Sequence, residues 1–382
     1  MTKNKKIAII GAGNAGCITA LALYQKFALD GLNYFTVSPP KIEITIYHDP
    51  SIPKEIVGLG TTLDIPEMLS QVLGIDWYEA NNAIKATPKT GILYENWGKK
   101  NEKIFHPFAL PSQSIHFVPD LLSKAVLQCG LFNVIEKNIT DPEKEIDADF
   151  IFDCRGKNNR DPELYETLIN PLNHVILARK PEPDLKLNYT RTVATPDGWT
   201  FVIPNHDSVS YGYLFNDKIT DVKDASSNFI EMFDVNPSEN FAFENYSAKS
   251  FTQGERTILN GNRAFFLEPL EATSMGYYHA VVELFLRNIL LNQDKDAFNA
   301  EIKSSTREVQ TFVMWHYQPG SKYDTAFWSY AKSLPFNPDA KFKKLAEYAK
   351  KNNDITCRLN AQALTYAQWN INSFKNWENG TN

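Results

Sequence analysis

The segment that decides the fold lies near the N-terminus, where residues 6–16 read KIAIIGAGNAG. A short apolar run leads into three glycines, and residues 17–27 then have helical composition. In a strand–GxGxxG–helix unit, the first glycine makes a tight turn, the second lets the backbone approach a pyrophosphate, and the third lets helix pack on strand. The phosphates then lie at the positive helix N-terminus. The pattern predicts dinucleotide binding, with a ligand-free glycine loop as the alternative, through Gly11, Ala12, Gly13, Asn14, Ala15 and Gly16.

The next predicted strand, Lys41–Tyr47, follows an insertion that contains two prolines. An acidic residue that binds the ribose is expected where this strand ends. His48 comes first and Asp49 second, so Asp49 is the candidate, and His48 or a backbone group is the alternative. The late position of the strand mildly favours FAD over NAD, because FAD-binding domains often carry longer insertions.

The composition indicates a globular protein of one large or two to three smaller domains, with 382 residues, 43% hydrophobic and 22% charged. The net charge of −6 and the absence of a basic stripe argue against nucleic acid as a partner. No apolar run reaches membrane-spanning length, so no membrane association is expected. Four cysteines without CxxC spacing read as reduced thiols, which predicts a cytoplasmic protein without a metal site.

A second informative stretch, residues 258–275, reads ILNGNRAFFLEPLEATSM. It places two acids, Glu268 and Glu271, in or beside an apolar run. Burying a carboxylate costs on the order of several kcal/mol unless it is paired or protonated, so the two acids indicate a functional site. The alternative is that both reach the surface or accept backbone N–H groups. A long helix is expected over Ser274–Asn292, capped by Thr273 or Ser274.

The segments between these two stretches predict a second, antiparallel sheet. The runs LNYTRTVA, WTFVIP and VSYGYLF occupy much of residues 187–215 and are separated by turn residues. Before them, Lys89 begins a strand-like run, and on composition alone a lysine there is more often an exposed charge. The aromatic segment Phe312–Trp328 is interpreted as core, and Glu378–Asn382 are expected to fray.

Four segments resemble the flavin-dependent tryptophan halogenase family. GAGNAG stands at 11–16, and GLGTTLDIP at 58–66 resembles the family's second glycine turn, GVGEATxP. PKTGILYENW at 88–97 is similar to the family's lysine-bearing strand, FKxxIxFxNW, and FLEPLEAT at 266–273 is similar to FLEPLEST. The combination of FLEPLE with the lysine strand is specific, so the chain is identified as a short, divergent member.

The resemblance implies a mixed α/β fold. It comprises an FAD-binding domain of the GxGxxG, two-dinucleotide type, an inserted antiparallel β-sheet and a helical C-terminal part. The expected bounds are 1–160 plus 250–330 for the FAD-binding domain, 161–249 for the β-rich substrate-side domain and 331–382 for the helical region.

The resemblance also implies a reaction. Reduced FAD from a separate, transiently bound flavin reductase, together with oxygen and a halide, yields hypohalous acid, which passes through a tunnel to Lys89. A lysine in an apolar tunnel has a lowered pKa and can hydrogen-bond or capture an electrophilic halogen. Glu271 is implied to orient this lysine and to help take up the ring proton. Lys85 is the competing assignment, but its spacing to Trp97 differs.

Further positions carry over from the family motifs. Thr273 and Ser274 match the halide position, where helix N-terminal N–H groups favour an anion. Besides the glycine loop and Asp49, the implied cofactor contacts are Thr62, Gly261, Asn262 and Met275.

The departures from the family pattern concern the tunnel and the substrate side. Phe201 replaces the second tryptophan of WxWxIP, Thr61 replaces the acid of GVGEAT, and Ala272 and Ser274 replace the last two fixed positions of FxxPxxSxG. The segment between Trp97 and the helix near Leu121 is short, and the C-terminal region is truncated. We therefore expect an indole- or phenol-type aromatic substrate, small or tethered, rather than free tryptophan.

Two alternatives to a halogenase stay open. One is an FAD-dependent monooxygenase or other oxidoreductase of the same fold that no longer uses halide, which the altered FxxPxxSxG pattern supports. The other is a flavin-binding protein without turnover. Lys89 and Glu271 argue against it, because neither is needed merely to hold FAD. The oligomeric state is also open, with a homodimer as the candidate.

Overall fold

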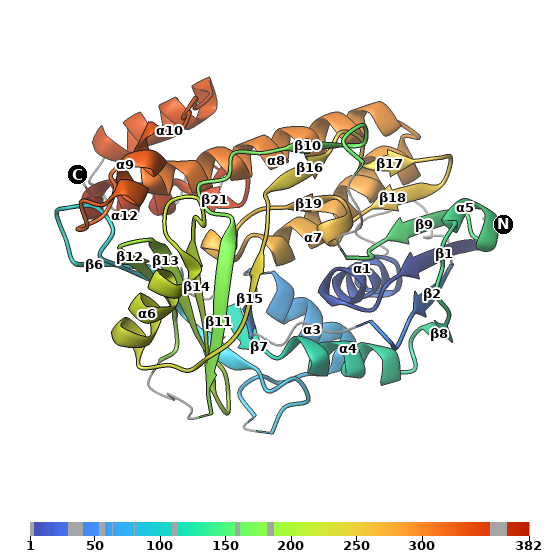
Figure 1. Cartoon of the computed structure of the whole chain (residues 1–382). Coiled ribbons are helices and arrows are strands. Elements are labelled where there is room, and N and C mark those ends of the chain that lie inside the picture. The colour runs from blue at the N-terminus through green and yellow to red at the C-terminus, as the bar shows by residue number, and fades with distance from the viewer. Residues whose placement is uncertain are drawn as a thin grey trace.

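Two larger sheets organise the molecule in the computed structural model, which describes residues 4–29, 41–52, 58–62, 64–79, 81–108, 114–156, 161–181, 187–351 and 365–381. One sheet has six strands in the order β17-β18-β9-β1-β2-β8, and the other has seven in the order β15-β11-β14-β13-β12-β5-β6. The long helix α8 (Lys295–Tyr317) runs along the top of the view in Figure 1. The predicted mixed α/β fold with a helical C-terminal part is confirmed.

The six-stranded sheet is built on the N-terminal β–α unit. Its central strand, β1, is buried on both faces, as is usual for a parallel strand. Ile7 and Ile9 belong to the core that includes helix α1 (Asn14–Tyr24), while Ala8 and Ile10 join a smaller cluster on the other face. The strands are β1 (Lys5–Ile10), β2 (Ile42–His48), β8 (Asn133–Glu136), β9 (Phe150–Asp153), β17 (Thr252–Gln253) and β18 (Thr257–Leu259).

The turn after β1 shows why it needs glycines. Gly11 has φ +103°, and a Cβ atom there would lie 2.9 Å from the Cys154 carbonyl oxygen. A Cβ atom at Gly16 would lie 1.9 Å from the Gly11 carbonyl oxygen, so the approach of α1 to the turn requires glycine. At Gly13 no atom lies within 4 Å of the corresponding position. The backbone at Gly13 therefore borders open space, which is what a pyrophosphate needs.

The seven-stranded sheet contains strands that precede residue 160 in the sequence and strands that follow it. β5 pairs in parallel with β12, and the inserted strands pair antiparallel around β13 and β14. One face packs on α6 (Val222–Phe233), and the other faces the main core. The domain division at residues 160, 249 and 330 stays a prediction. The strands are β5 (Gly91–Glu95), β6 (Lys103–Pro107), β11 (His174–Lys180), β12 (Thr190–Thr195), β13 (Gly198–Pro204), β14 (Val209–Phe215) and β15 (Pro237–Ala242).

The C-terminal helices return to the body of the protein. Helix α10 (Ala340–Lys351) packs on α12 (Ile371–Thr381), and α12 packs on β6. Glu378 is 6% exposed and Thr381 is 7% exposed, so the expectation that this end frays is wrong for residues 378–381. Asn382 lies outside the described residues. Close packing is the reason, since a Cβ atom at Gly380 would lie 2.6 Å from the Ile104 side chain.

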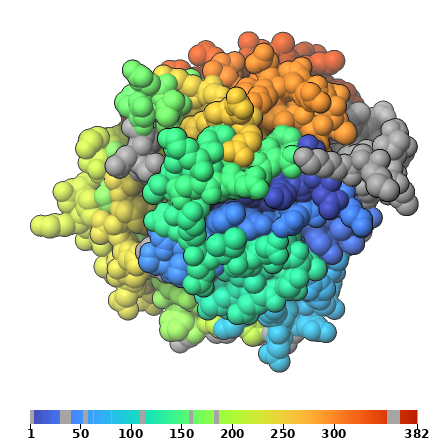
Figure 2. Space-filling model, turned by 90° about the vertical axis from the view of Figure 1, so that its right-hand side faces the viewer, coloured from blue at the N-terminus to red at the C-terminus, as the bar shows by residue number. Residues whose placement is uncertain are grey.

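Shorter elements connect these layers. Figure 2 looks onto the side of the molecule that carries β8, where the blue-green surface lies beneath the orange surface of the later helices.

None of the helices in the described ranges combines the length and the apolar character needed to cross a bilayer. The remaining elements used below are β3 (Leu59–Gly60), β4 (Thr87–Lys89), β7 (Ser114–Phe117), α7 (Ser274–Leu284), β20 (Thr365–Tyr366) and β21 (Trp369–Asn370).

The glycine geometry predicts a selective effect of adding one methyl group. Gly16→Ala should lower the free energy of unfolding by about 3 kcal/mol, because the backbone of the turn must move to admit the Cβ atom. Gly156→Ala is the matched control, since no atom lies within 4 Å of a Cβ atom there, and it should change stability by no more than about 0.5 kcal/mol. Urea unfolding measures both. Equal effects of the two substitutions would contradict the packing described here.

Candidate active site

Lys89 is the buried cation of the site. It ends β4 in the small sheet β3-β7-β4, pairs with Ser114 and is 1% exposed. Its Nζ lies over the Phe108 ring, 5.4 Å from the ring centroid. A Cβ atom at Gly60 would lie 2.9 Å from Nζ, so the glycine turn on β3 makes room for the ammonium group. The alternative that Lys89 is an exposed charge is excluded.

Burial changes the acid–base chemistry of this lysine. Desolvation lowers the pKa of Lys89 from 10.5 to about 8, and the nearby Glu271 carboxylate partly opposes the shift. About half of the Lys89 amines are therefore neutral near pH 8. A neutral amine is a nucleophile, whereas a lysine with its ordinary pKa is almost fully protonated at this pH.

Glu271 occupies a strained corner directly before helix α7. It lies in the short 3-10 turn Leu270–Ala272, with φ +73° at Glu271 and +53° at Ala272. Side chains rarely adopt this left-handed region, and each such residue costs on the order of 1–3 kcal/mol, which surrounding contacts must offset. Strain of this kind clusters at functional sites.

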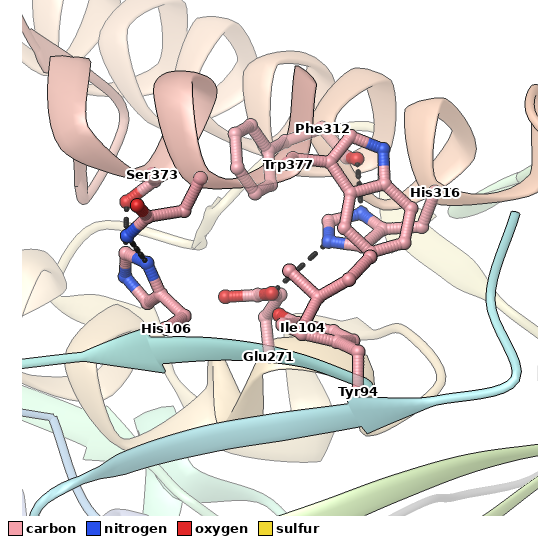
Figure 3. A pocket seen from close by; sticks show the side chains of 9 residues that line it. Tyr94, Ile104, His106, Glu271, Phe312, His316, Ser373 and Trp377 are labelled. Carbon is pink, nitrogen blue, oxygen red and sulfur yellow. Dashed lines mark hydrogen bonds and ion pairs between the residues drawn. The ribbon is translucent and has the colours of Figure 1, made fainter. Parts of the chain in front are cut away.

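Two ring nitrogens contact the Glu271 carboxylate. His316 Nε2, on α8, lies 3.1 Å from Glu271 Oε1. The dashed line between these two residues in Figure 3 marks this contact. Trp369 of β21 donates from Nε1 to Oε2 at 2.8 Å. His316 and Glu271 are both nearly fully buried, with side-chain exposures of 2% and 6%. The carboxylate is thus fixed by two elements that lie far from it in the sequence.

The other acid of the FLEPLE stretch has different surroundings. Glu268 is fully buried, and its Oε1 accepts hydrogen bonds from the Tyr317 hydroxyl and, at 3.2 Å, from Trp199 Nε1. Burial raises the pKa of Glu268 to about 7. Consecutive residues of α8, His316 and Tyr317, therefore each hold one of the two acids.

A small cavity lies between the β5–β6 hairpin and helices α8 and α12 (Figure 3). It has room for about one water molecule. The cavity is therefore too small for an aromatic ring with its walls as they stand. The lining residues are Tyr94, Ile104, His106, Glu271, Phe312, His316, Ser373, Asn376 and Trp377.

Helix α12 closes this cavity through hydrogen bonds to His106. Asn376 Nδ2 donates to His106 Nδ1 at 2.7 Å, so Nε2 carries the imidazole proton and faces Ser373 Oγ at 3.4 Å. Burial, reinforced by the positive charges of His316 and Lys89, lowers the pKa of His106 to about 4. His106 is therefore neutral at pH 7.

His116 is a second neutral imidazole in the surroundings of Lys89. Burial, with the field of Lys89 added, holds the pKa of His116 well below its usual range. His116 Nε2 lies 2.8 Å from Thr190 Oγ1. Neither His106 nor His116 thus competes with Lys89 as a cation.

The predicted halide position lies at the N-terminus of α7. Thr273 is the N-cap, and its carbonyl accepts from Tyr277 N at 3.1 Å. Thr273 therefore occupies the expected N-cap position, although its side chain makes no capping hydrogen bond. Ser274 is the first helical residue rather than the cap. The N–H groups of a first helical turn have no partner within the helix and attract anions, which fits the predicted role of Thr273 and Ser274.

The residues expected at the cofactor converge around α1 and α7. Gly261 has φ +64° and packs on α1, where its Cβ atom would lie 2.4 Å from that of Ala15. Asn262 follows in the same turn, with its carbonyl accepting from the Tyr246 hydroxyl at 2.5 Å. Met275 is buried in the first turn of α7.

Two further expected cofactor residues lie at strand and turn ends. The Thr62 hydroxyl lies 3.2 Å from where a Cβ atom of Gly276 would stand, so this turn reaches α7. Asp49 follows β2, and its Oδ1 accepts from Ser51 Oγ at 2.6 Å and Ser51 N at 2.9 Å. These hydrogen bonds lower the pKa of the Asp49 carboxyl, so it is ionised at neutral pH. Its contact with a ribose stays a prediction.

Several residues of the site were missed by sequence reasoning. His316 lies in the aromatic segment that was interpreted as core, and that segment does form ring clusters. Trp369, Ser373, Asn376 and Trp377 come from the C-terminal region, which carried no motif. A histidine inside an otherwise aromatic, buried helix was the one available signal. Within the described ranges, no group of three or more potential metal ligands occurs.

The chain belongs to the tryptophan halogenase family, because the profile of that family matches residues 6–122 and 123–378. Tryptophan 7-halogenase KtzQ from Kutzneria sp. (strain 744) is 25% identical over 248 residues, which cover 60% of this chain and 46% of KtzQ. The chain spans about half the length of the curated relatives it matches. The family predicted from the four segments is confirmed.

Solved structures share the fold over almost the whole chain. The crystal structure of MibH, described as a lanthipeptide tryptophan 5-halogenase, has a TM-score of 0.79 at 18% identity and covers 99% of this chain and 85% of its own. The structure of tryptophan 6-halogenase SttH from Streptomyces toxytricini has a TM-score of 0.77 at 18% identity, with coverages of 99% and 90%.

Burial of the Lys89 ammonium predicts that this residue lowers stability. Its folded-state pKa of about 8 lies below the unfolded value of 10.5, so the penalty is complete below pH 8 and disappears as the pH rises through 10.5. Lys89→Met should raise the free energy of unfolding at pH 7 by on the order of 2 kcal/mol, and by much less at pH 10.5.

Urea unfolding at the two pH values measures this difference. Lys85→Met is the matched control, because the Lys85 side chain is 45% exposed and its ion pair with Asp207 contributes at most about 1 kcal/mol. A Lys89→Met protein that is no more stable than the wild type at pH 7 contradicts the buried cation.

Proposed function

We propose that this protein is a flavin-dependent halogenase that halogenates an electron-rich aromatic ring. The observation that supports it most is the buried Lys89, with its lowered pKa, in the field of the clamped Glu271 carboxylate. Neither residue is needed to bind a dinucleotide, and the two together supply the electrophile-holding group and the base that ring halogenation requires.

The proposed cofactor is FAD, in its reduced form and supplied by a separate flavin reductase. The open space at Gly13 and the tight packing at Gly11 and Gly16 fit a pyrophosphate at the N-terminus of α1. When bound, reduced FAD supplies, with oxygen and a halide, hypohalous acid as the source of electrophilic halogen. The halide would be held by the first-turn N–H groups at Thr273 and Ser274.

The residues of this chain then have distinct tasks. Lys89 binds the hypohalous acid and presents its halogen to the ring. A ring carbon forms the new bond to halogen as the halogen–oxygen bond breaks, and the leaving hydroxide takes a proton from the Lys89 ammonium and departs as water. The proton on the ring carbon passes to Glu271 while its bonding electrons return to the ring. Glu271 then returns this proton to the Lys89 amine, so that one hypohalous acid and one arene give one haloarene and one water.

The substrate proposed is a neutral indole- or phenol-type ring, free or tethered, other than free tryptophan. Apart from Glu271 and its partner His316, the lining of the cavity offers no charged group to a ligand, because His106 is neutral. A free amino acid would bury an ammonium and a carboxylate without partners there. The likeness to MibH, described as a lanthipeptide tryptophan 5-halogenase, supports a ring that is part of a larger molecule.

A second candidate is an FAD-dependent monooxygenase that no longer uses halide. The observation that favours it is Ala272, which lies with φ +53° directly before the proposed halide position, where FxxPxxSxG has serine. Halide-independent oxygenated product in the assays below would establish this function instead. A cytoplasmic location and a homodimer also remain predictions.

Halogenation should depend on Lys89 and not on Lys85. We expect brominated product when the protein is incubated with FAD, a flavin reductase, NADH, bromide and a panel of indoles and phenols, analysed by mass spectrometry. Lys89→Met should lower the rate at least about 100-fold, because Lys89 is the only buried lysine in the described ranges. Lys85→Met, the exposed control, should stay within about twofold. Wild-type rates in Lys89→Met would rule out the proposed role.

The lining of the cavity also predicts a substrate preference. Indole should be brominated with a kcat/KM at least about tenfold above that of free tryptophan, since burying the charged head group without partners costs more than the ring contacts return. Competition between the two in one reaction gives the ratio directly. A preference for free tryptophan would contradict the proposed substrate class.

A further inference from the structure

The contact between His316 and Glu271 has a consequence for the proton content of the site. His316 Nδ1 lies 2.9 Å from the Phe312 carbonyl oxygen, which only accepts hydrogen bonds, so Nδ1 carries a proton. His316 Nε2 lies 3.1 Å from Glu271 Oε1. A bare ring nitrogen and an ionised carboxylate oxygen would both be acceptors and would repel each other. One further proton therefore lies between the two groups.

The surroundings of the pair decide on which side this proton resides. A carboxylate at Glu271 is favoured by Lys89, by the Trp369 N–H group and by the N-terminus of α7, which begins three residues later. Glu271 Oε2 accepts a hydrogen bond from Trp369, and Glu271 Oε1 faces His316. When Glu271 is ionised, the remaining lone pairs of both oxygens can accept a proton from the side of the cavity. An imidazolium opposite an ionised carboxylate forms the stronger, charge-assisted hydrogen bond.

Other titratable groups near His316 do not neutralise it. His106 on β6 is neutral, Tyr94 on β5 is an uncharged phenol whose ring centroid lies 5.5 Å from that of His316, and Lys89 is a like charge. On α12, the Glu378 carboxylate is paired with Lys350. Glu271 is thus the counter-ion that His316 contacts.

We propose that His316 is a positioning residue that keeps Glu271 ionised and fixed in its left-handed corner by donating a charge-assisted hydrogen bond from Nε2. This inference rests on the proposed function, in which Glu271 takes the ring proton. An ionised Glu271 can accept that proton at once, whereas a protonated one cannot. The imidazolium stays in place throughout and gives up no proton in the step.

Nitrogen NMR of the resting protein tests the proton count without flavin, halide or substrate. The full chain is labelled with 15N-histidine, and among the seven histidines the His316 signals are those lost in His316→Gln. We expect both His316 nitrogens to be protonated at pH 7. In Glu271→Gln, the new amide can donate to Nε2, and that nitrogen should move to the position of a non-protonated imidazole nitrogen.

A non-protonated Nε2 in the wild-type protein would overturn the proposal, because the shared proton would then reside on Glu271. If His316→Gln does not fold, the Glu271→Gln spectrum decides, since a single histidine should respond to loss of that carboxylate. This readout is independent of catalysis. A protein that shows the expected spectrum but no halogenation would refute the proposed function and leave the His316–Glu271 pair intact.

Kinetics of bromination of indole provide the second arm. His316→Gln keeps a hydrogen-bond donor but removes the charge, and it should lower kcat about 10- to 100-fold with KM within about threefold. The acid limb of the pH–rate profile should move to higher pH, because Glu271 has lost its neighbouring cation. An unchanged kcat with an unchanged acid limb would contradict the proposal.

Tyr317→Phe is the matched control from the next position of α8. It removes the hydrogen bond to Glu268 and leaves His316 and Glu271 in place. The His316 nitrogen signals and the acid limb should stay as in the wild type. If Tyr317→Phe moved both as His316→Gln does, the effect would be a general loosening of α8, and the positioning role would be refuted.

Discussion

The burial of the Lys89 ammonium beside the Glu271 carboxylate is the constraint on which the rest of the site depends. Desolvation lowers the pKa of the lysine to about 8, and the carboxylate limits the shift, so the amine titrates close to physiological pH. Burial of Lys89 lowers the stability of the fold but gives the amine the pKa that the proposed chemistry needs, and such a trade-off is common at active sites. Gly60 leaves room for the Lys89 ammonium group, and Glu271 itself lies in the left-handed region with φ +73°.

Helix α8 connects the chemistry to the architecture. Its consecutive residues His316 and Tyr317 hold Glu271 and Glu268, the two acids of one short segment. The same helix packs against α7, whose N-terminus forms the proposed halide position. The two acids in the apolar FLEPLE stretch find their partners on other elements, namely α8, β13 and β21. Such donors are specified by tertiary structure and leave no local motif.

The residues that could be predicted from the sequence are those whose roles depend on their neighbours in the chain. Gly11 is required by a tight turn, and Gly16 is required by the close approach of helix α1 to that turn. Both constraints act within a few residues, so the glycine pattern could be recognised in the sequence. Lys89 was identifiable only through the family resemblance, because composition favours an exposed lysine. His106 and Asn376 could not be paired in advance, since their hydrogen bond joins residues 270 positions apart. Fraying was wrongly expected at the C-terminus because the contact of Gly380 with Ile104 is equally non-local.

The central claim is that Lys89 is a buried amine with a depressed pKa. Selective 13C labelling of lysine side chains, with assignment of Lys89 by its loss in Lys89→Met, allows the titration of this one amine to be followed by NMR between pH 6 and 12. We expect a midpoint near pH 8 for Lys89, which should move lower in Glu271→Gln because the opposing carboxylate is gone. A Lys89 midpoint at or above pH 10 would contradict it.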